Sequence, residues 1–362
     1  MAINEKAGNI KRAEGITKNR ALVGPEIAQI TAVRKCNQSC KYCWIYSDVA
    51  NRYCKLYNNF YMKFRKNQDF PISKFKEVVD DLAEIGTPTL SISGDGEPFM
   101  HKNLGEMVRY AHEKGLSVGI QTNGTISLEN FKEIGMISFL NIHVPSLNEK
   151  NSRLLQASGI SYLDRVIRNI QWISRMAEHR TMPKIELGLV VNKINCNEII
   201  DFFDFALKYN IDSVCLKKLR SFNHVDELCL DKGDIEKIRD SVKFLLGSGK
   251  SRKVKNNLAA FLKELNTEES RKRQKCLVGY YRVYINLDGS TSLCCWNPFR
   301  SFGNVFKKRL KDIWFSKKAD NLRGKMQSIN TAKVLWRTCR TCPLSTVDLN
   351  KKLCNISEYF SS

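Results

Sequence analysis

The feature that most constrains the fold is a repeated change of hydrophobic period between residues 26 and 246. Short apolar runs, typical of buried strands, occur at residues 26–33, 89–93, 116–121, 137–144, 184–191 and 211–218. Segments with apolar residues at helical spacing alternate with them, at residues 73–86, 103–114, 127–134, 162–178, 197–209 and 234–246. This alternation predicts an α/β fold with a parallel sheet, either a partial barrel or an open doubly wound sheet.

The alternation stops near residue 250. A predicted helix at residues 255–265 is followed by "YRVYINLDGSTSLCCW", in which Asp288-Gly289 is a strong turn signal between two strands. The first 24 residues resemble a loosely ordered arm. We therefore predict an arm at residues 1–24, a core domain at 25–250 and a smaller domain at 251–362.

Composition narrows the class of protein. Apolar residues make up 43% of the 362, enough for a full core. The N-terminus has no apolar signal-peptide segment, and no run approaches 18 apolar residues, so we expect a cytoplasmic protein without a membrane partner. The 13 cysteines are an odd number, and in such a chain they favour metal binding or catalysis over a disulfide framework.

The chain is strongly basic, with a formal net charge of +22. This favours an anionic partner such as nucleic acid or a phosphorylated or acidic substrate, but a lysine-rich solvated surface explains it equally well. Residues 51–68 interleave basic and aromatic side chains, as a nucleic-acid-stacking surface would.

The loop after the first predicted strand carries three cysteines, Cys36, Cys40 and Cys43, in "CNQSCKYC". Three thiolates can hold three irons of a [4Fe–4S] cluster and leave the fourth iron open, whereas electron-transfer clusters and structural zinc sites use four ligands. In a parallel barrel, loops at the carboxyl ends of strands carry function, and this loop has that position.

The motif resembles the signature of the radical S-adenosylmethionine (SAM) enzymes, in which the cysteine pattern includes an aromatic residue, here Tyr42. The resemblance implies a partial (β/α)6 TIM-like barrel and an open iron that binds SAM. It also implies reductive cleavage of SAM to a 5′-deoxyadenosyl radical that abstracts a substrate hydrogen. A low-potential donor such as a flavodoxin or ferredoxin would supply the electron.

Further loops match the family by position. "GDGEP" resembles the family's G-G-E-P motif, with Asp95 in place of the second glycine. The resemblance implies SAM contacts from Tyr42 in the cysteine loop and from residues in the loops after the second to fifth strands: Gly94, Asp95, Gly96, Glu97, Pro98, Thr122, Asn123, Ser146 and Asn192.

The C-terminal cysteines form a second set. Cys339 and Cys342 are a C-x2-C pair, and with Cys276 and Cys294 they can close around zinc or a [4Fe–4S] cluster. The order of motifs resembles the SPASM/twitch extension of radical SAM enzymes. The middle run of cysteines is truncated, which points to one auxiliary cluster. Cys295 and Cys354 are left over, and Cys295 is an alternative to Cys294.

These resemblances favour a net oxidation, with the auxiliary cluster accepting an electron from a small-molecule or peptide substrate. The alternatives are a peptide maturase or epimerase of the same superfamily, an RNA-modifying enzyme, and a zinc-stabilised binding protein without catalysis. An epimerase would need a thiol donor, for which Cys215 is a candidate, although a buried core cysteine is the simpler interpretation. His143, Lys217, Lys218 and Arg220 are candidate bases by position, and the catalytic residue itself is not assigned.

Overall fold

The computed structural model describes residues 2–43, 45–47, 69–157, 162–178, 181–219, 225–265, 276–294 and 301–327. The basic and aromatic stretch at 51–68, Arg220 and the cysteines at 295, 339, 342 and 354 lie outside these ranges.

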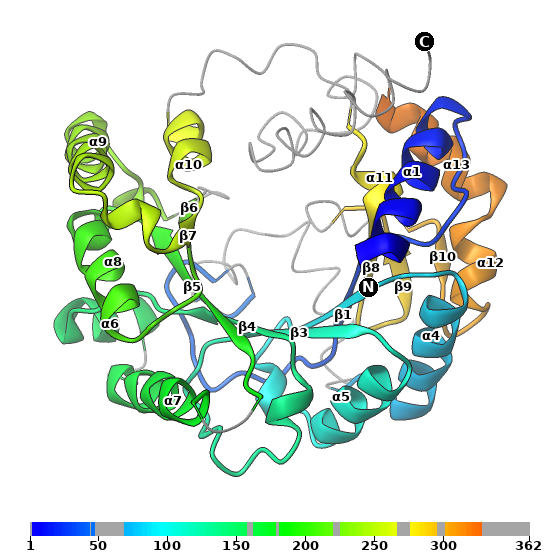
Figure 1. Cartoon of the computed structure of the whole chain (residues 1–362), viewed down its shortest axis with the longest axis horizontal. Helices are drawn as coiled ribbons and strands as arrows, with labels where there is room; N and C mark the ends of the chain where they lie inside the picture. The colour runs from blue at the N-terminus through cyan, green and yellow to red at the C-terminus, as the bar shows by residue number, and fades with distance from the viewer. Residues whose placement is uncertain are drawn as a thin grey trace.

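One curved sheet dominates the described residues (Figure 1). Its ten strands are β1 (Ile27–Thr31), β2 (Thr89–Ser93), β3 (Ser117–Thr122), β4 (Phe139–His143), β5 (Lys184–Val191), β6 (Ser213–Lys218), β7 (Lys255–Asn256), β8 (Arg282–Ile285), β9 (Ser290–Ser292) and β10 (Gly303–Asn304). Their order is β10-β9-β8-β1-β2-β3-β4-β5-β6-β7. Strands β1 to β7 pair in parallel, β8 pairs in parallel with β1, and β9 and β10 are antiparallel to their neighbours. The six predicted barrel strands are therefore confirmed.

Helices cover the convex face of the sheet (Figure 1). The α-helices are α1 (Ala2–Thr17), α4 (Ile72–Glu84), α5 (Leu104–Glu113), α6 (Glu149–Gln156), α7 (Leu163–Met176), α8 (Ile199–Lys208), α9 (Lys232–Gly247), α10 (Leu258–Leu265), α11 (Val278–Tyr281), α12 (Leu310–Trp314) and α13 (Lys317–Gln327). Alternate strand residues such as Ile142, Leu187 and Leu216 pack with helix residues in one large core. Because side chains alternate along a strand, the residues between them face the concave side.

The helix predicted at residues 127–134 is wrong. A short 3-10 helix, Ile134–Met136, stands near its end, and no α-helix forms over 127–133. The side chain of Asn169 explains this, because it accepts a hydrogen bond from the Leu128 amide and donates to the carbonyls of Gly124 and Ile126. These tertiary bonds compete with helical hydrogen bonds.

The N-terminal residues also differ from the expectation of a loosely ordered arm, because they form α1. Arg12 forms an ion pair with Glu26 and donates to the carbonyl of Gly24, while Ala13 and Ile16 are buried. Ile16 packs with Leu277 and Tyr280. Helix α1 is therefore held by the C-terminal part of the chain, which local sequence does not reveal.

The sheet continues through the region of the predicted boundary at residue 250. Strand β7 adds to the β6 edge, and the hairpin of β8 and β9, with Gly289 at φ 78° in its turn, adds to the β1 edge. The buried carboxylate of Asp81 on α4 also accepts two hydrogen bonds from the guanidinium of Arg309, at 3.1 and 2.7 Å. The C-terminal part is thus attached to the barrel by strand pairing and by ion pairing, and the domain limits themselves stay predictions. No helix among the described residues has the length and apolarity to cross a bilayer.

Candidate active site

The cysteine loop leaves the carboxyl end of β1, and its three thiols lie close enough to influence one another electrostatically. All three cysteines are half-buried. Burial raises the pKa of Cys36 to about 11 and also raises the pKa of Cys40 and Cys43. The thiols are therefore protonated at neutral pH until a metal displaces the protons, so iron binding here releases protons.

Backbone amides already point at one of these sulfurs. The amides of Ile45 and Tyr46 lie 3.5 and 3.3 Å from the Sγ of Cys43. The amide nitrogen of the Asn123 side chain lies 4.0 Å from the Sγ of Cys36. Donors of this kind stabilise a thiolate and tune a cluster bound to it. The donor set therefore fits an iron–sulfur cluster.

The glycine-rich loop after β2 contacts the cysteine loop through main-chain hydrogen bonds. The amide of Gly96 donates to the carbonyl of Val33 at 3.2 Å, and the amide of Glu97 donates to the carbonyl of Lys35 at 2.7 Å. A Cβ at Gly96 would lie 2.0 Å from the Lys35 carbonyl oxygen, and one at Gly94 would lie 3.0 Å from that of Val33. Glycine is therefore required at both positions, because two backbones approach each other directly.

Asp95, which departs from the family's glycine, has a partner in this structure. Its carboxylate forms an ion pair with Arg34 at 2.7 Å, and both side chains are largely buried. Burial raises the pKa of Asp95 despite the neighbouring guanidinium.

Glu97 connects the glycine-rich loop to the loop after β3. Its carboxylate accepts hydrogen bonds from the hydroxyl of Thr122 and the amide of Asn123, both at 2.7 Å, and from the amide of Phe99 at 3.1 Å. Burial raises the pKa of Glu97 to about 7. Pro98, the next residue, is buried and begins a short 3-10 helix, Pro98–Met100. Asn123 donates in turn to the side chain of Asn37 in the cysteine loop at 2.9 Å. The structure therefore brings together the residues predicted in the first three loops.

Tyr42 lies on the other side of the cysteine loop. It packs against a small buried cluster that includes Leu155, Leu219 and Leu228, and burial raises the pKa of its hydroxyl well above the ordinary value. The amide of the preceding residue, Lys41, donates to the carbonyl of Leu155 on α6 at 2.8 Å. Helix α6, which the sequence analysis missed, thus anchors this end of the loop.

Ser146 and Asn192 hold loops in place. Ser146 is fully buried, and its hydroxyl lies 2.7 Å from the carboxylate of Glu198, which also accepts from the amide of Leu147. Asn192 is fully buried, and its side chain accepts from the amide of Ile194 and donates to the carbonyl of Val190. These hydrogen bonds hold the loops after β4 and β5 in place, and the SAM contacts of both residues stay predictions.

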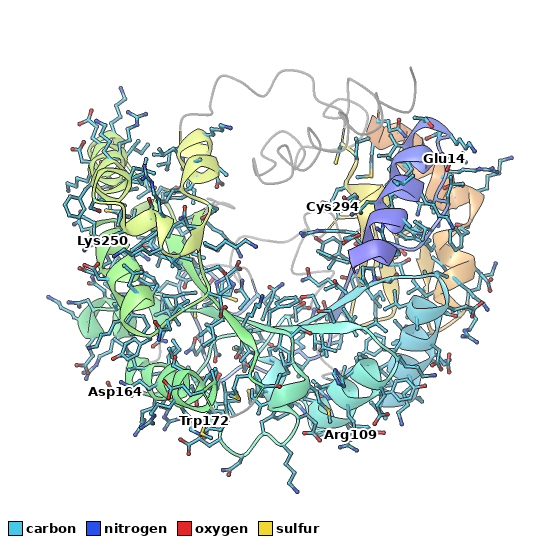
Figure 2. The ribbon with its side chains drawn as sticks, viewed as in Figure 1. Glu14, Arg109, Asp164, Trp172, Lys250 and Cys294 are labelled. Atoms are coloured by element: carbon cyan, nitrogen blue, oxygen red, sulfur yellow. The ribbon has the colours of Figure 1, made fainter. Side chains whose placement is uncertain are left out.

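The two described cysteines of the second set, Cys276 and Cys294, are half-buried and pack against the main core. Figure 2 places Cys294 in the region of β8 and β9, apart from the outer-layer residues Asp164 and Arg109. Thr291 on β9 pairs with Ile285 and Ser292 with Tyr284, and these pair with Ile30 and Gln29 on β1. Strand β9 therefore runs toward the amino end of β1. Cys294 follows β9 at the amino ends of the parallel strands, whereas the loop with Cys36 leaves from their carboxyl ends.

Family models match both cysteine regions. A model of the radical SAM superfamily matches residues 30–206, and a model of an iron–sulfur cluster-binding domain, SPASM, matches residues 276–343. The chain carries a radical SAM domain followed by a SPASM domain. These domains imply [4Fe–4S] clusters and SAM as cofactors, and the SPASM match contains all four cysteines of the second set.

Several known proteins resemble this radical SAM protein. It is 26% identical over 217 residues to an Fe-coproporphyrin III synthase of Methanosarcina barkeri, covering 59% of this chain and 49% of that protein. It is 24% identical over 304 residues to a tungsten-containing aldehyde ferredoxin oxidoreductase cofactor-modifying protein of Pyrococcus furiosus, covering 76% and 80%. The chain spans about half the length of the first curated relatives that it matches.

Solved structures share the fold. Streptococcus suis SuiB bound to SAM matches with a TM-score of 0.64 at 18% identity, covering 91% of this chain and 75% of SuiB. The same protein bound to its precursor peptide SuiA also matches with a TM-score of 0.64.

Proposed function

We propose that this radical SAM protein cleaves SAM reductively at a cluster held by Cys36, Cys40 and Cys43, and that it oxidises its substrate. The observation that carries this proposal is the geometry of the cysteine loop, which presents three mutually close thiols and is braced by Gly96 and Asn37. Three thiolates without a fourth protein ligand suit a [4Fe–4S] cluster with one open iron better than a structural zinc site, which uses four ligands.

When bound, the cluster and SAM supply a carbon-centred radical that removes a hydrogen atom from the substrate. The chain's own residues prepare this chemistry. Amides near Cys43 stabilise its thiolate, and the Arg34–Asp95 and Glu97–Asn123 contacts fix the loops around the site. A closed set of Cys276, Cys294, Cys339 and Cys342 would hold a second cluster with no free iron, suited to accepting an electron.

The oxidation also needs a base for a substrate proton. Burial, with a contribution from the charge of Lys217, lowers the pKa of His143 to about 3. Such an imidazole is neutral at physiological pH, but it is a weak base, because it holds a proton poorly. Of the described residues proposed as the base, Lys217 and Lys218 therefore remain candidates.

The test is anaerobic reconstitution with measurement of iron and sulfide, followed by addition of dithionite and SAM. We expect 5′-deoxyadenosine from the wild-type protein and none from the Cys36→Ala, Cys40→Ala or Cys43→Ala variants. Removing Cys276, Cys294, Cys339 and Cys342 together should remove about half of the iron, by the two-cluster assignment. Cys196→Ala is the matched control, because Cys196 belongs to neither set and is buried beside Asp234. Zinc in place of iron, with no 5′-deoxyadenosine, would refute the proposal.

The substrate class is tested separately. The likeness to SuiB extends to the fold, and SuiB has been solved with a peptide, so a peptide substrate is the alternative to a small molecule. Retention of RNA by the protein at low salt, lost as salt is raised, would instead support the RNA-modifying alternative.

A further inference from the structure

Polar side chains gather on the concave face of strands β4 to β6. Asn141 and His143 lie on β4, Glu186 on β5 and Cys215 on β6. Their strand neighbours Leu140, Ile142, Ile185, Leu187, Val214 and Leu216 are buried in the core shared with the outer helices. The polar set therefore points to the opposite face, toward the interior around which the sheet curves (Figure 1).

The strand register connects this set to the cysteine loop. Asn141 stands directly between Gln121 on β3 and Glu186 on β5. Two residues after Gln121 comes Asn123, whose side chain bonds Asn37 next to Cys36. The polar residues on β4 to β6 are thus neighbours, across the sheet, of strand β3, whose following loop contacts the cysteine loop.

Two acceptors in this set are not saturated. The amide nitrogen of Asn141 donates to the carboxylate of Glu186. Because a carboxylate only accepts hydrogen bonds, the nitrogen must face it, and the Oδ1 of Asn141 is left on the other side. Asn141 is only 8% exposed, and this Oδ1 has no hydrogen-bond partner. Among the described residues, no cation forms an ion pair with Glu186.

Gly188 lies directly beside these acceptors. A Cβ at this position would lie 3.0 Å from the Nδ1 of His143 and 3.3 Å from the Oδ1 of Asn141, closer than ordinary contact, so any larger residue would press on both side chains. His143 adds no positive charge here, because its imidazole is neutral. Lys217 is exposed, and its charge acts on His143, but among the described residues it forms no ion pair with Glu186.

Taken together, these observations describe an unpartnered buried acceptor, the Oδ1 of Asn141, next to the carboxylate of Glu186, with no cationic donor between them. We propose that Glu186 and the Oδ1 of Asn141, beside Gly188, form a subsite for a protonated primary amine of the substrate. This rests on the proposed function, in which the substrate reacts inside the barrel. An ammonium group has three donors and a positive charge, so it can satisfy both acceptors at once.

The subsite is tested by fluorine NMR titration of the anaerobically reconstituted protein with 4-fluorobenzylamine and with 4-fluorobenzyl alcohol, its uncharged analogue. We expect the wild-type protein to bind the amine about tenfold more tightly than the alcohol, as charged hydrogen bonds would give. In Glu186→Gln the ratio should fall to about two or less. Gly188→Ala should weaken the binding of both probes alike, because its methyl group would press on Asn141 and His143, and it tests the subsite even if Glu186→Gln fails to fold.

The control is Glu236→Gln, which changes the charge equally on the exposed surface of α9 and should keep the tenfold ratio. Equal binding of both probes to the wild-type protein, as when Lys217 pairs with Glu186 in solution, overturns the subsite. An unchanged ratio in Glu186→Gln also overturns it. Since the readout is binding, it is independent of 5′-deoxyadenosine formation, whose absence would refute the proposed function instead.

Competition distinguishes the source of the amine. A blocked peptide with one lysine is titrated against bound 4-fluorobenzylamine, together with the same peptide acetylated on Nζ. Displacement by the free lysine alone assigns the amine to a peptide side chain. Retention of the probe assigns it to a small molecule, and both results support an amine subsite.

Discussion

Arg34 and Asp95 form an ion pair with 2.7 Å between Nη2 and Oδ2, and the two side chains are only 6% and 13% exposed. The pair joins the cysteine loop to the glycine-rich loop at the position where this chain departs from the family's glycine. A residue that departs from the motif has therefore become part of the support for the cysteines.

Replacing one partner of this pair should be costly. Asp95→Asn leaves the guanidinium of Arg34 buried without its carboxylate, and we expect a loss of about 3–5 kcal/mol in the free energy of unfolding. Denaturant unfolding under anaerobic conditions measures this. Asp240→Asn, at the exposed pair with Lys243, is the control and should cost no more than about 1 kcal/mol. Equal losses in the two variants would contradict the prediction.

Gly96→Ala should separate the two loops, because its Cβ would lie 2.0 Å from the carbonyl oxygen of Lys35. We expect a destabilisation of at least about 1–3 kcal/mol, the usual range for overpacking, together with reduced iron content after reconstitution. Gly247→Ala is the matched control, since nothing lies within 4 Å of a Cβ there. Full iron content in Gly96→Ala would show that the loop tolerates the displacement.

Glu97 should make stability fall as pH rises. Its pKa is raised from 4.5 to about 7 in the folded protein, so the folded state holds a proton that the unfolded state has released between these values. Stability from this group is therefore present at low pH and lost as pH rises to about 7. The Glu97→Gln variant resembles the protonated form of Glu97. Its free energy of unfolding should therefore fall less between pH 5.5 and 7.5 than that of the wild-type protein. An identical pH profile in both proteins would rule out a titrating Glu97.

Asp81→Asn should loosen the contact between α4 and the C-terminal part. Asp81 is 1% exposed and accepts two bonds from Arg309 and one from the amide of Leu310. The loss of charged hydrogen bonds should cost about 1.5–3 kcal/mol in unfolding free energy. The control is Asp312→Asn on exposed α12 surface, which should be close to neutral. Faster proteolytic cleavage between the two parts in Asp81→Asn, but not in the control, is the second measurement.

Sequence patterns predicted the barrel strands and the place of the cysteine loop well, because hydrophobic period and cysteine spacing are local properties. The segment at 127–133 could not be predicted, since Asn169, about 40 residues further along the chain, holds it out of a helix. The hydrogen bond between the hydroxyl of Ser146 and Glu198 joins residues 52 positions apart, and no local pattern reveals it. The Asn141–Glu186 contact likewise arises only when β4 and β5 pair. In each case the deciding partner comes from another strand–helix unit.

The antiparallel course of β9 has a consequence for the direction of electron flow. Cys36 follows the carboxyl end of β1, and Cys294 lies toward the amino ends of the strands. The length of the strands therefore separates the two cysteines, and each strand residue adds about 3.3 Å to the distance between them. In the proposed oxidation, the electron that starts a turnover enters at one edge and the electron taken from the substrate departs toward the other. Strand pairing rather than a flexible linker would then set the distance between donor and acceptor, so the two electrons of each turnover would be kept apart by the fold itself.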